Sequence, residues 1–161
     1  MTKLSAPRVA IYNSTNTELV STWDVGTLKA QRPSEVLTVK IWNNKQGSES
    51  VSDLKECMIM ILDGVGDTSN DDVARDRWVQ INCPAVDGNS NVWTAIGGTL
   101  GKDIKCDDNT VTDFTIRGIA NDGIEANSSS NVATVNLRIV APPNSVPGDK
   151  AFRVRLCAFF T

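Results

Sequence analysis

Two segments of the chain decide its fold: Ala133-Thr-Val-Asn-Leu-Arg-Ile-Val140 and Phe152-Arg-Val-Arg-Leu-Cys-Ala-Phe159. Apolar residues occupy every second position in both, which is the period of a β-strand with one buried face. In the second segment the alternation points Arg153 and Arg155 outward, away from an apolar inner face. Residues 141–149 between the segments contain three prolines and Gly148, so they predict a crossing loop and not a helix.

Six other short segments have the character of strands and are separated by turn residues. They are residues 8–12, 37–42, 57–62, 78–83, 92–96 and 113–117. Residues 57–62 are apolar on both faces, which predicts either a central strand covered on both sides or a strand that faces a partner. Residues 51–56 predict at most one helical turn, with Ser52 as its cap. The sequence therefore predicts an all-β protein, a sandwich of seven to nine mostly antiparallel strands in a single domain over residues 1–161.

The composition excludes several classes of enzyme. The chain has 161 residues, of which 40% are hydrophobic and 22% charged, as in an ordinary globular domain. It contains no histidine, so Ser-His-Asp and Cys-His nucleophile systems and all histidine-ligated zinc or haem sites are excluded. The sequence predicts no catalytic residue and no cofactor.

The charge pattern and the hydropathy pattern argue against two kinds of partner. The net charge is −3, and no basic stripe is interleaved with aromatic residues, so nucleic acid is not expected to bind. No stretch of eighteen apolar residues is present, and residues 1–7 are not followed by the apolar run of a secretory signal. We therefore expect no membrane partner and synthesis in a cytoplasm.

The four cysteines are Cys57, Cys83, Cys106 and Cys157. Their spacing matches neither a C-x-x-C redox motif nor a pair of zinc knuckles. The spacing favours reduced, structural thiols, which a cytoplasm would maintain. A bridge between Cys57 and Cys157, or between Cys83 and Cys106, stays open because spacing alone does not decide it.

Acidic residues gather most densely in residues 63–72, where Asp63, Asp67, Asp71 and Asp72 accompany Asn70. Calcium favours such oxygen-rich loops, but glycines stand where an EF-hand loop has ligands, and no glutamate occupies the twelfth position. We expect a solvated hairpin loop without a metal, with a bound cation as the alternative. A second acidic group, residues 107–109 with Asp113, is weaker, and neither group predicts the paired carboxylates of a glycosidase.

Two tryptophans mark a candidate interface. The alternation places Trp42 and Trp78 on the faces that point away from the core, beside Lys40 and Gln80. An exposed indole offers a large apolar area and one N–H donor, which suits either a protein interface or a sugar-stacking platform. The alternative is that the assignment slips by one residue, for example at a β-bulge, in which case both indoles are buried.

The long segment 118–131 is rich in glycine, asparagine and serine, but it follows no buried parallel strand and opens no helix. A phosphate-binding role therefore has no structural context. A loop of this length is either a contact with a partner or a plain connection between strands.

Several segments together resemble short virion proteins of tailed phages that infect Gram-positive bacteria. They are Val39-Lys-Ile-Trp-Asn-Asn-Lys45, Val51-Ser-Asp-Leu-Lys-Glu-Cys57, Arg77-Trp-Val79, GIANDGIEA from Gly118 to Ala126, and the closing APPNSVPGDKAFRVRL from Ala141 to Leu156. The resemblance extends from about Val39 to Phe160 and contains no catalytic motif. It implies an immunoglobulin-like β-sandwich displayed on the particle, either as a capsid decoration or head-accessory protein or as a tail component.

This resemblance implies a function in binding. The expected partner is the major capsid protein or another virion protein, with self-association on the particle as a further possibility. A virion component is made in the host cytoplasm and released by lysis, so it needs no export signal. Two alternatives stay open: a tail or baseplate accessory protein, and a host-adhesion module that binds a cell-surface glycan.

Overall fold

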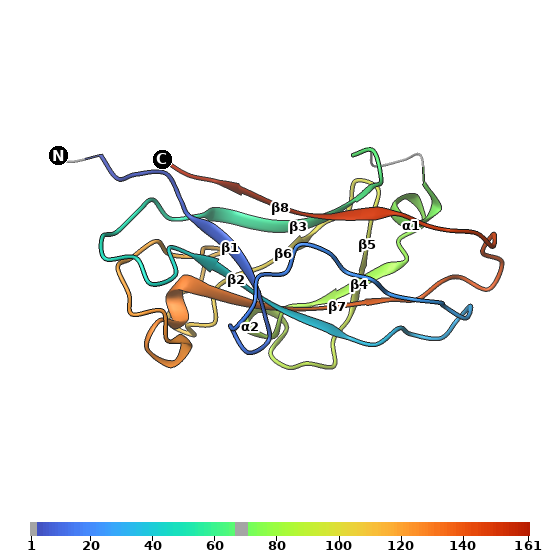
Figure 1. Ribbon diagram of the computed structural model, residues 1–161, viewed down its shortest axis with the longest axis horizontal. Helices are drawn as coiled ribbons and strands as arrows, with labels where there is room; N and C mark the ends of the chain where they lie inside the picture. Colours follow the sequence, from blue (N-terminus) through green and yellow to red (C-terminus); the bar gives the residue numbers. More distant parts are fainter. Residues whose placement is uncertain (1–2, 67–70) are drawn as a thin grey trace.

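The computed structural model describes residues 3–66 and 71–161. Its strands form two antiparallel sheets that pack face to face (Figure 1). The larger sheet has the order β1 (Val9–Asn13), β2 (Leu37–Asn43), β7 (Val132–Ile139), β4 (Val79–Asn82), β5 (Thr94–Ile96). The smaller sheet has the order β6 (Lys102–Asp103), β3 (Lys55–Asp63), β8 (Phe152–Phe159). The prediction of an all-β sandwich with seven to nine mostly antiparallel strands is confirmed, and the immunoglobulin-like subclass stays a prediction.

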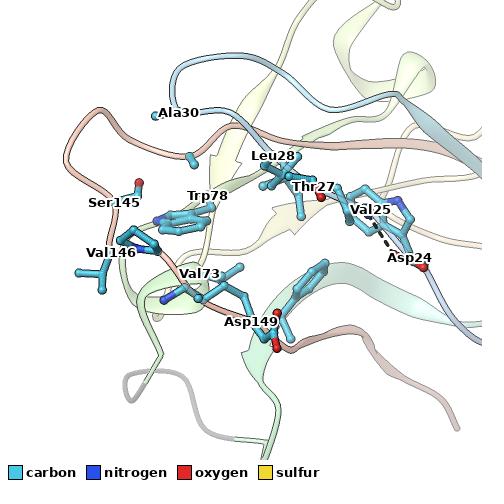
Figure 2. Close-up of a pocket in the computed structure, with 18 residues that line it drawn as sticks. Asp24, Val25, Thr27, Leu28, Ala30, Val73, Trp78, Ser145, Val146 and Asp149 are labelled. Atoms are coloured by element: carbon cyan, nitrogen blue, oxygen red, sulfur yellow. Dashed lines mark hydrogen bonds between the residues drawn. The ribbon is translucent and has the colours of Figure 1, made fainter.

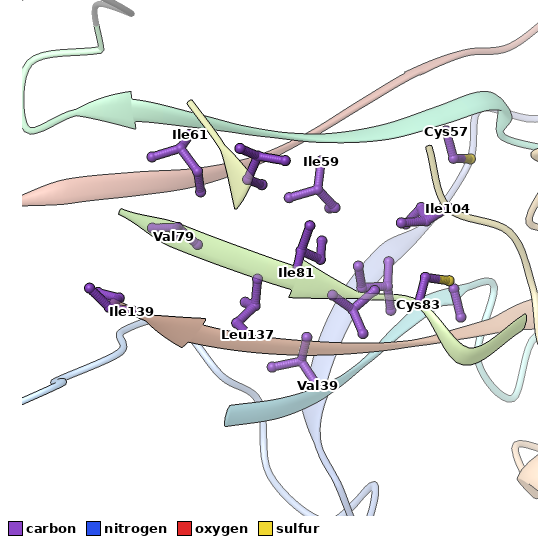
Figure 3. Packing of buried hydrophobic residues seen from close by; sticks show 14 of the residues in the cluster. Val39, Cys57, Ile59, Ile61, Val79, Ile81, Cys83, Ile104, Leu137 and Ile139 are labelled. Carbon is purple, nitrogen blue, oxygen red and sulfur yellow. The ribbon is translucent and has the colours of Figure 1, made fainter. Parts of the chain in front are cut away.

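The core lies between the two sheets and follows the alternation of the strands (Figure 3). Cys57, Ile59 and Ile61 of β3 point toward Val79 and Ile81 of β4 and toward Cys83, which directly follows β4. All six side chains are buried. Successive residues of a strand point to opposite faces, so each strand gives every second side chain to this layer. As predicted, β3 is the central strand of its sheet.

The helices of the described residues are short. Two α-helices, α1 (Asp72–Arg75) and α2 (Pro84–Asp87), and two 3-10 helices, η1 (Glu125–Asn127) and η2 (Ser129–Asn131), lie in the connections between strands. Asp71 caps α1 by accepting a hydrogen bond from the backbone N–H of Val73. Over residues 3–66 and 71–161, no helix has the length and hydropathy needed to cross a bilayer.

Two local predictions are wrong. Residues 51–56 form no helical turn, because Val51 and Leu54 make isolated β-bridges to Ser5 and Ile116, and β3 begins at Lys55. Residues 113–117 form no regular strand: they make an isolated bridge from Ile116 to Leu54, and the carbonyl of Phe114 accepts a hydrogen bond from the backbone N–H of Cys57. Both segments are too short to reveal from sequence which long-range partner they have.

The two sheets differ in their number of strands, and this difference leaves one edge of the smaller sheet uncovered. The smaller sheet has three strands and the larger has five. At one side of the smaller sheet β8 pairs with β3, and its other edge has no strand partner within residues 3–66 and 71–161. Residues 20–28, which we call the strap, run from β1 between the two layers beside this edge (Figure 1).

Candidate interaction surface

A groove lies between β8 and the inner face of the larger sheet. It has a volume of about 680 Å³. Its walls are mainly apolar, and they come from both sheets and the strap. They include Ile11, Leu37, Val39, Val135, Ile59, Val154 and Leu156. An apolar groove of this kind suits apolar side chains of a partner. Polar residues, among them Ser21, Asp24 and Lys150, also line it.

A second hollow, of about 840 Å³, continues the groove toward one end of the sandwich. The strap lines it on one side and the loop from Ser145 to Lys150 on the other (Figure 2). The indole of Trp78 lies beside Ser145 and Val146 of this loop. Its Nε1–H is buried and has no hydrogen-bond partner among the described residues. Charged side chains line the same hollow, including Asp149 and Lys150, and the ammonium of Lys150 lies 5.7 Å from the Trp78 ring.

The strap is held by side chains. Trp23 packs edge-on against Phe152, with the two ring centroids 5.5 Å apart. Val25 and Leu28 are half-buried against the core. Within residues 21–28, no backbone group bonds to another backbone group of the described chain. Val20, the first residue of the strap, donates its backbone N–H to the carbonyl of Ile11 at 2.9 Å. Because residues 21–28 have no ladder to break within the described chain, they can be moved at lower cost than a paired strand.

Strand β8 combines an apolar inner face with a basic outer face. Arg153 and Arg155 are exposed, and neither forms an ion pair within residues 3–66 and 71–161. The guanidinium of Arg153 donates one hydrogen bond of 2.8 Å to the carbonyl of Gly64. Val154 on the other face is 39% exposed although it borders the groove. The strand therefore presents unpaired charge and uncovered apolar surface at the same edge.

The prediction that Trp42 is exposed is wrong. Trp42 does lie on the outer face of the larger sheet, opposite in direction to Ile41, as the alternation requires. It is nevertheless fully buried. Its Nε1–H donates to Oδ1 of Asn16 at 2.7 Å, and the ammonium of Lys45 lies 5.5 Å from its ring. The face was assigned correctly, but chain segments cover it.

The predicted exposure of Trp78 is wrong for a different reason. Trp78 is 5% exposed and belongs to the core. It precedes β4, which begins at Val79, and the residue before it, Arg77, has a φ of 59°. A left-handed residue interrupts the alternation of a strand, so the period of two does not extend back to Trp78. The indole turns inward as a result.

Lys40 and Gln80 do lie on the outer face, but both take part in local contacts. Lys40 donates hydrogen bonds to Glu125 at 2.6 Å and to Thr134 at 2.9 Å. Gln80 accepts a hydrogen bond from Arg138 at 2.8 Å. The structure does not bring Trp42 and Trp78 together, and therefore the four predicted residues form no common surface.

The segment 118–131 is a folded cover. Glu125 accepts hydrogen bonds from Lys40 and from Asn16, the latter at 2.6 Å. Asp122 accepts bonds from the backbone of Ile124 and from Asn127, which lower the pKa of its carboxyl. The contacts of Glu125 hold the segment against β2 and the turn at Asn16, and they help to close the outer face over Trp42.

The acidic segments hold no recognisable metal centre in the described chain. Residues 67–70 lie outside the described residues, so the predicted hairpin loop is only partly described. In the part that is described, no three or more acidic or cysteine side chains gather as metal ligands. Asp107 is instead a structural residue. Burial raises the pKa of its carboxyl, although the Thr134 N–H and hydroxyl donate to it at 2.9 and 2.7 Å.

The four cysteines are free in the structure, so neither of the two possible bridges is present. Cys57, Cys83 and Cys106 are buried, whereas Cys157 on β8 is half-buried. Burial raises the pKa of the Cys57 thiol to about 12. The buried thiols behave as small apolar core residues.

Sequence reasoning missed the groove and the strap. The apolar residues Trp23, Val25 and Leu28 show no strand or helix period, so no signal marked the segment as a cover of the core. The outward arginines of β8 were visible in the sequence, but its edge position was not. No protein-family model matches this chain, and no curated protein matches it at a significant level.

Proposed function

We propose that the protein is a non-catalytic component of a phage particle that binds other virion proteins. More specifically, we propose that it is a capsid decoration or head-accessory protein that binds the assembled major capsid protein. The resemblance described above supplies the virion context. The observation that carries the binding role is the open β8 edge with its apolar groove, on a sandwich whose opposite broad face is covered over Trp42.

Binding at such an edge stabilises a particle through repetition. A capsid presents the same site many times, so a modest free energy per copy adds up over the shell. A protein that binds only the assembled lattice shifts the equilibrium toward assembly by mass action. A sandwich with a closed core between its sheets would withstand the environment outside the cell.

A tail or baseplate location is the alternative within the same class. The glycan-binding alternative depended on exposed indoles together with the Asp/Asn loops, and it has lost the indoles, because Trp42 and Trp78 do not form an exposed platform. No other observation in the described chain favours it.

The copy number of the protein in purified particles tests the proposal. Particles are prepared from a lysate of the bacterium that carries the gene, and the protein is quantified by mass spectrometry against the major capsid protein. Hundreds of copies per particle support a capsid location, and a handful or a multiple of six supports the tail. Particles that lack the protein would refute the proposed function in both forms.

A further inference from the structure

The unpaired edge of β8 is long enough to accept another strand. The strand has 8 residues. Residues 152–159 make no backbone hydrogen bond outside the β3 ladder within the described chain. In an antiparallel pair, every second residue directs its N–H and C=O away from the partner strand. A row of free donors and acceptors therefore lies along this edge, which is the template for β-strand addition.

The groove beside the edge fits one face of such a strand. A strand added next to β8 would widen the smaller sheet toward the uncovered part of the larger one. Its inward side chains would then enter the groove of about 680 Å³ over Val39 and Val135. Ile11 and Leu37, at the margin of the groove, are only half-buried in the isolated chain. Apolar side chains at alternate positions of the incoming strand would complete this burial.

The strap is compatible with this arrangement. It covers part of the groove through side-chain contacts such as that between Trp23 and Phe152. Because residues 21–28 form no backbone hydrogen bonds with one another or with the rest of the described chain's backbone, an incoming strand displaces no ladder.

The charge of the edge determines the partner. The outward side chains of an added strand would lie directly beside Arg153 and Arg155, which have no acidic partner in the described chain. Cross-strand neighbours of opposite charge stabilise a sheet, and like charges destabilise it. The incoming strand is therefore expected to alternate apolar residues with acidic ones.

The same charges oppose pairing with a second copy. Two β8 strands related by a two-fold axis near residues 153 to 155 would place an arginine opposite an arginine. Positive charges on an edge strand are a known protection against self-pairing. The edge thus favours an acidic partner over another copy of this chain.

We infer that β8 binds an extended, acidic–apolar alternating segment of another virion protein by β-strand addition. This inference rests on the proposed function for the identity of the partner, but the capacity of the edge does not depend on it. Affinity comes from backbone hydrogen bonds and groove burial, and charge selectivity comes from the two arginines.

Synthetic peptides test the inference directly. The probe is an acetylated, amidated peptide of alternating glutamate and valine, as long as β8, and its charge-reversed counterpart alternates lysine and valine. We expect the acidic peptide to bind the wild-type protein about tenfold more tightly than the basic one at low salt. The variant Arg153→Glu with Arg155→Glu should reverse this preference.

The matched control is Arg32→Glu with Arg117→Glu. Both arginines are exposed and without ion pairs in the described chain, and the change in net charge is the same. This variant should keep the wild-type preference. If both double variants changed the peptide preference equally, the preference would follow the net charge of the protein, and the assignment to β8 would be overturned.

Amide hydrogen exchange followed by NMR supplies the structural readout. Binding of the acidic peptide should slow exchange at alternate residues of β8, namely those whose N–H groups do not bond to β3. A peptide methylated on alternate backbone nitrogens should lose binding. Protection elsewhere without the alternating pattern in β8 would overturn the inference. Protection of these amides in the free protein that grows with protein concentration would show that a second copy occupies the edge, which also overturns it.

The two proposals fail separately. If the peptide does not bind while the protein is abundant in particles, strand addition is wrong and the virion role stands. If the peptide binds as expected while particles lack the protein, the edge works as inferred but its partner is not a virion protein.

Discussion

Replacement of Trp42 by alanine tests whether the outer face of the larger sheet is closed. The indole is fully buried. A buried tryptophan removes about 200 Å² of surface from water, and at about 25 cal/mol per Å² this corresponds to about 5 kcal/mol. Partial collapse of the cavity brings measured losses for such substitutions to about 3–5 kcal/mol. The hydrogen bond to Asn16, 2.7 Å long, contributes about 1 kcal/mol.

We therefore expect Trp42→Ala to lower the free energy of unfolding by about 3–5 kcal/mol in urea titrations followed by circular dichroism. Trp42→Phe keeps most of the apolar contact and should cost about 1–2 kcal/mol, because it removes the N–H donor and leaves a smaller cavity. The matched control is Trp93→Ala. Trp93 is half-buried under the guanidinium of Arg138, 4.2 Å from its ring, and its loss should cost about 1–2 kcal/mol.

A loss below about 1 kcal/mol for Trp42→Ala would refute this reasoning. Such a value would mean that the indole lies at the surface in solution, as the strand alternation alone predicted. The outer face would then be available for binding, and the case for the β8 edge would weaken.

Three further predictions follow from single residues. Gly97 has a φ of 148°, and a Cβ there would lie 2.1 Å from a backbone oxygen of α1. Gly97→Ala should therefore cost about 2–3 kcal/mol, against about 1 kcal/mol for Gly88→Ala at an open left-handed position. Ellman's reagent should modify Cys157 alone in the folded protein, because the other thiols are buried; rapid native reaction of a second thiol would contradict this. Burial raises the folded pKa of Asp107 above its unfolded value, so this group contributes stability below the unfolded pKa that is lost as pH rises through the folded pKa. In the variant Asp107→Asn, the free energy of unfolding from urea titrations should no longer show this decrease from about pH 4 upward. A variant whose free energy of unfolding depends on pH as in the wild type would contradict the assignment.

The strands could be predicted because the alternation of apolar and polar residues within each short segment already indicates which of its faces is buried. Val135 and Leu137 of β7 are buried, whereas Asn136 and Arg138, which alternate with them in sequence, are half-buried. The proline-rich loop before β8 was equally clear. In contrast, β6 has only two residues and gives no period to detect.

The candidate surface could not be predicted because it depends on long-range pairing and cover. The sequence gives the direction of Trp42, but not that Asn16 and the segment around Glu125 close over its face. Similarly, the alternation of β8 exposes Arg153 and Arg155, but only the sheet order reveals that no strand lies beyond them. Which strand is last in a sheet is a property of the whole fold.

Incorporation of the charge-reversed variants into particles is the most direct test of whether the β8 edge binds another virion protein. Particles are assembled in bacteria that produce either Arg153→Glu with Arg155→Glu or Arg32→Glu with Arg117→Glu in place of the wild-type protein. Both variants should be folded by circular dichroism. If β8 binds the partner, the control variant should reach the wild-type copy number, while the copy number of the β8 variant should fall about tenfold or more. Equal copy numbers of the two variants in purified particles would contradict binding through β8.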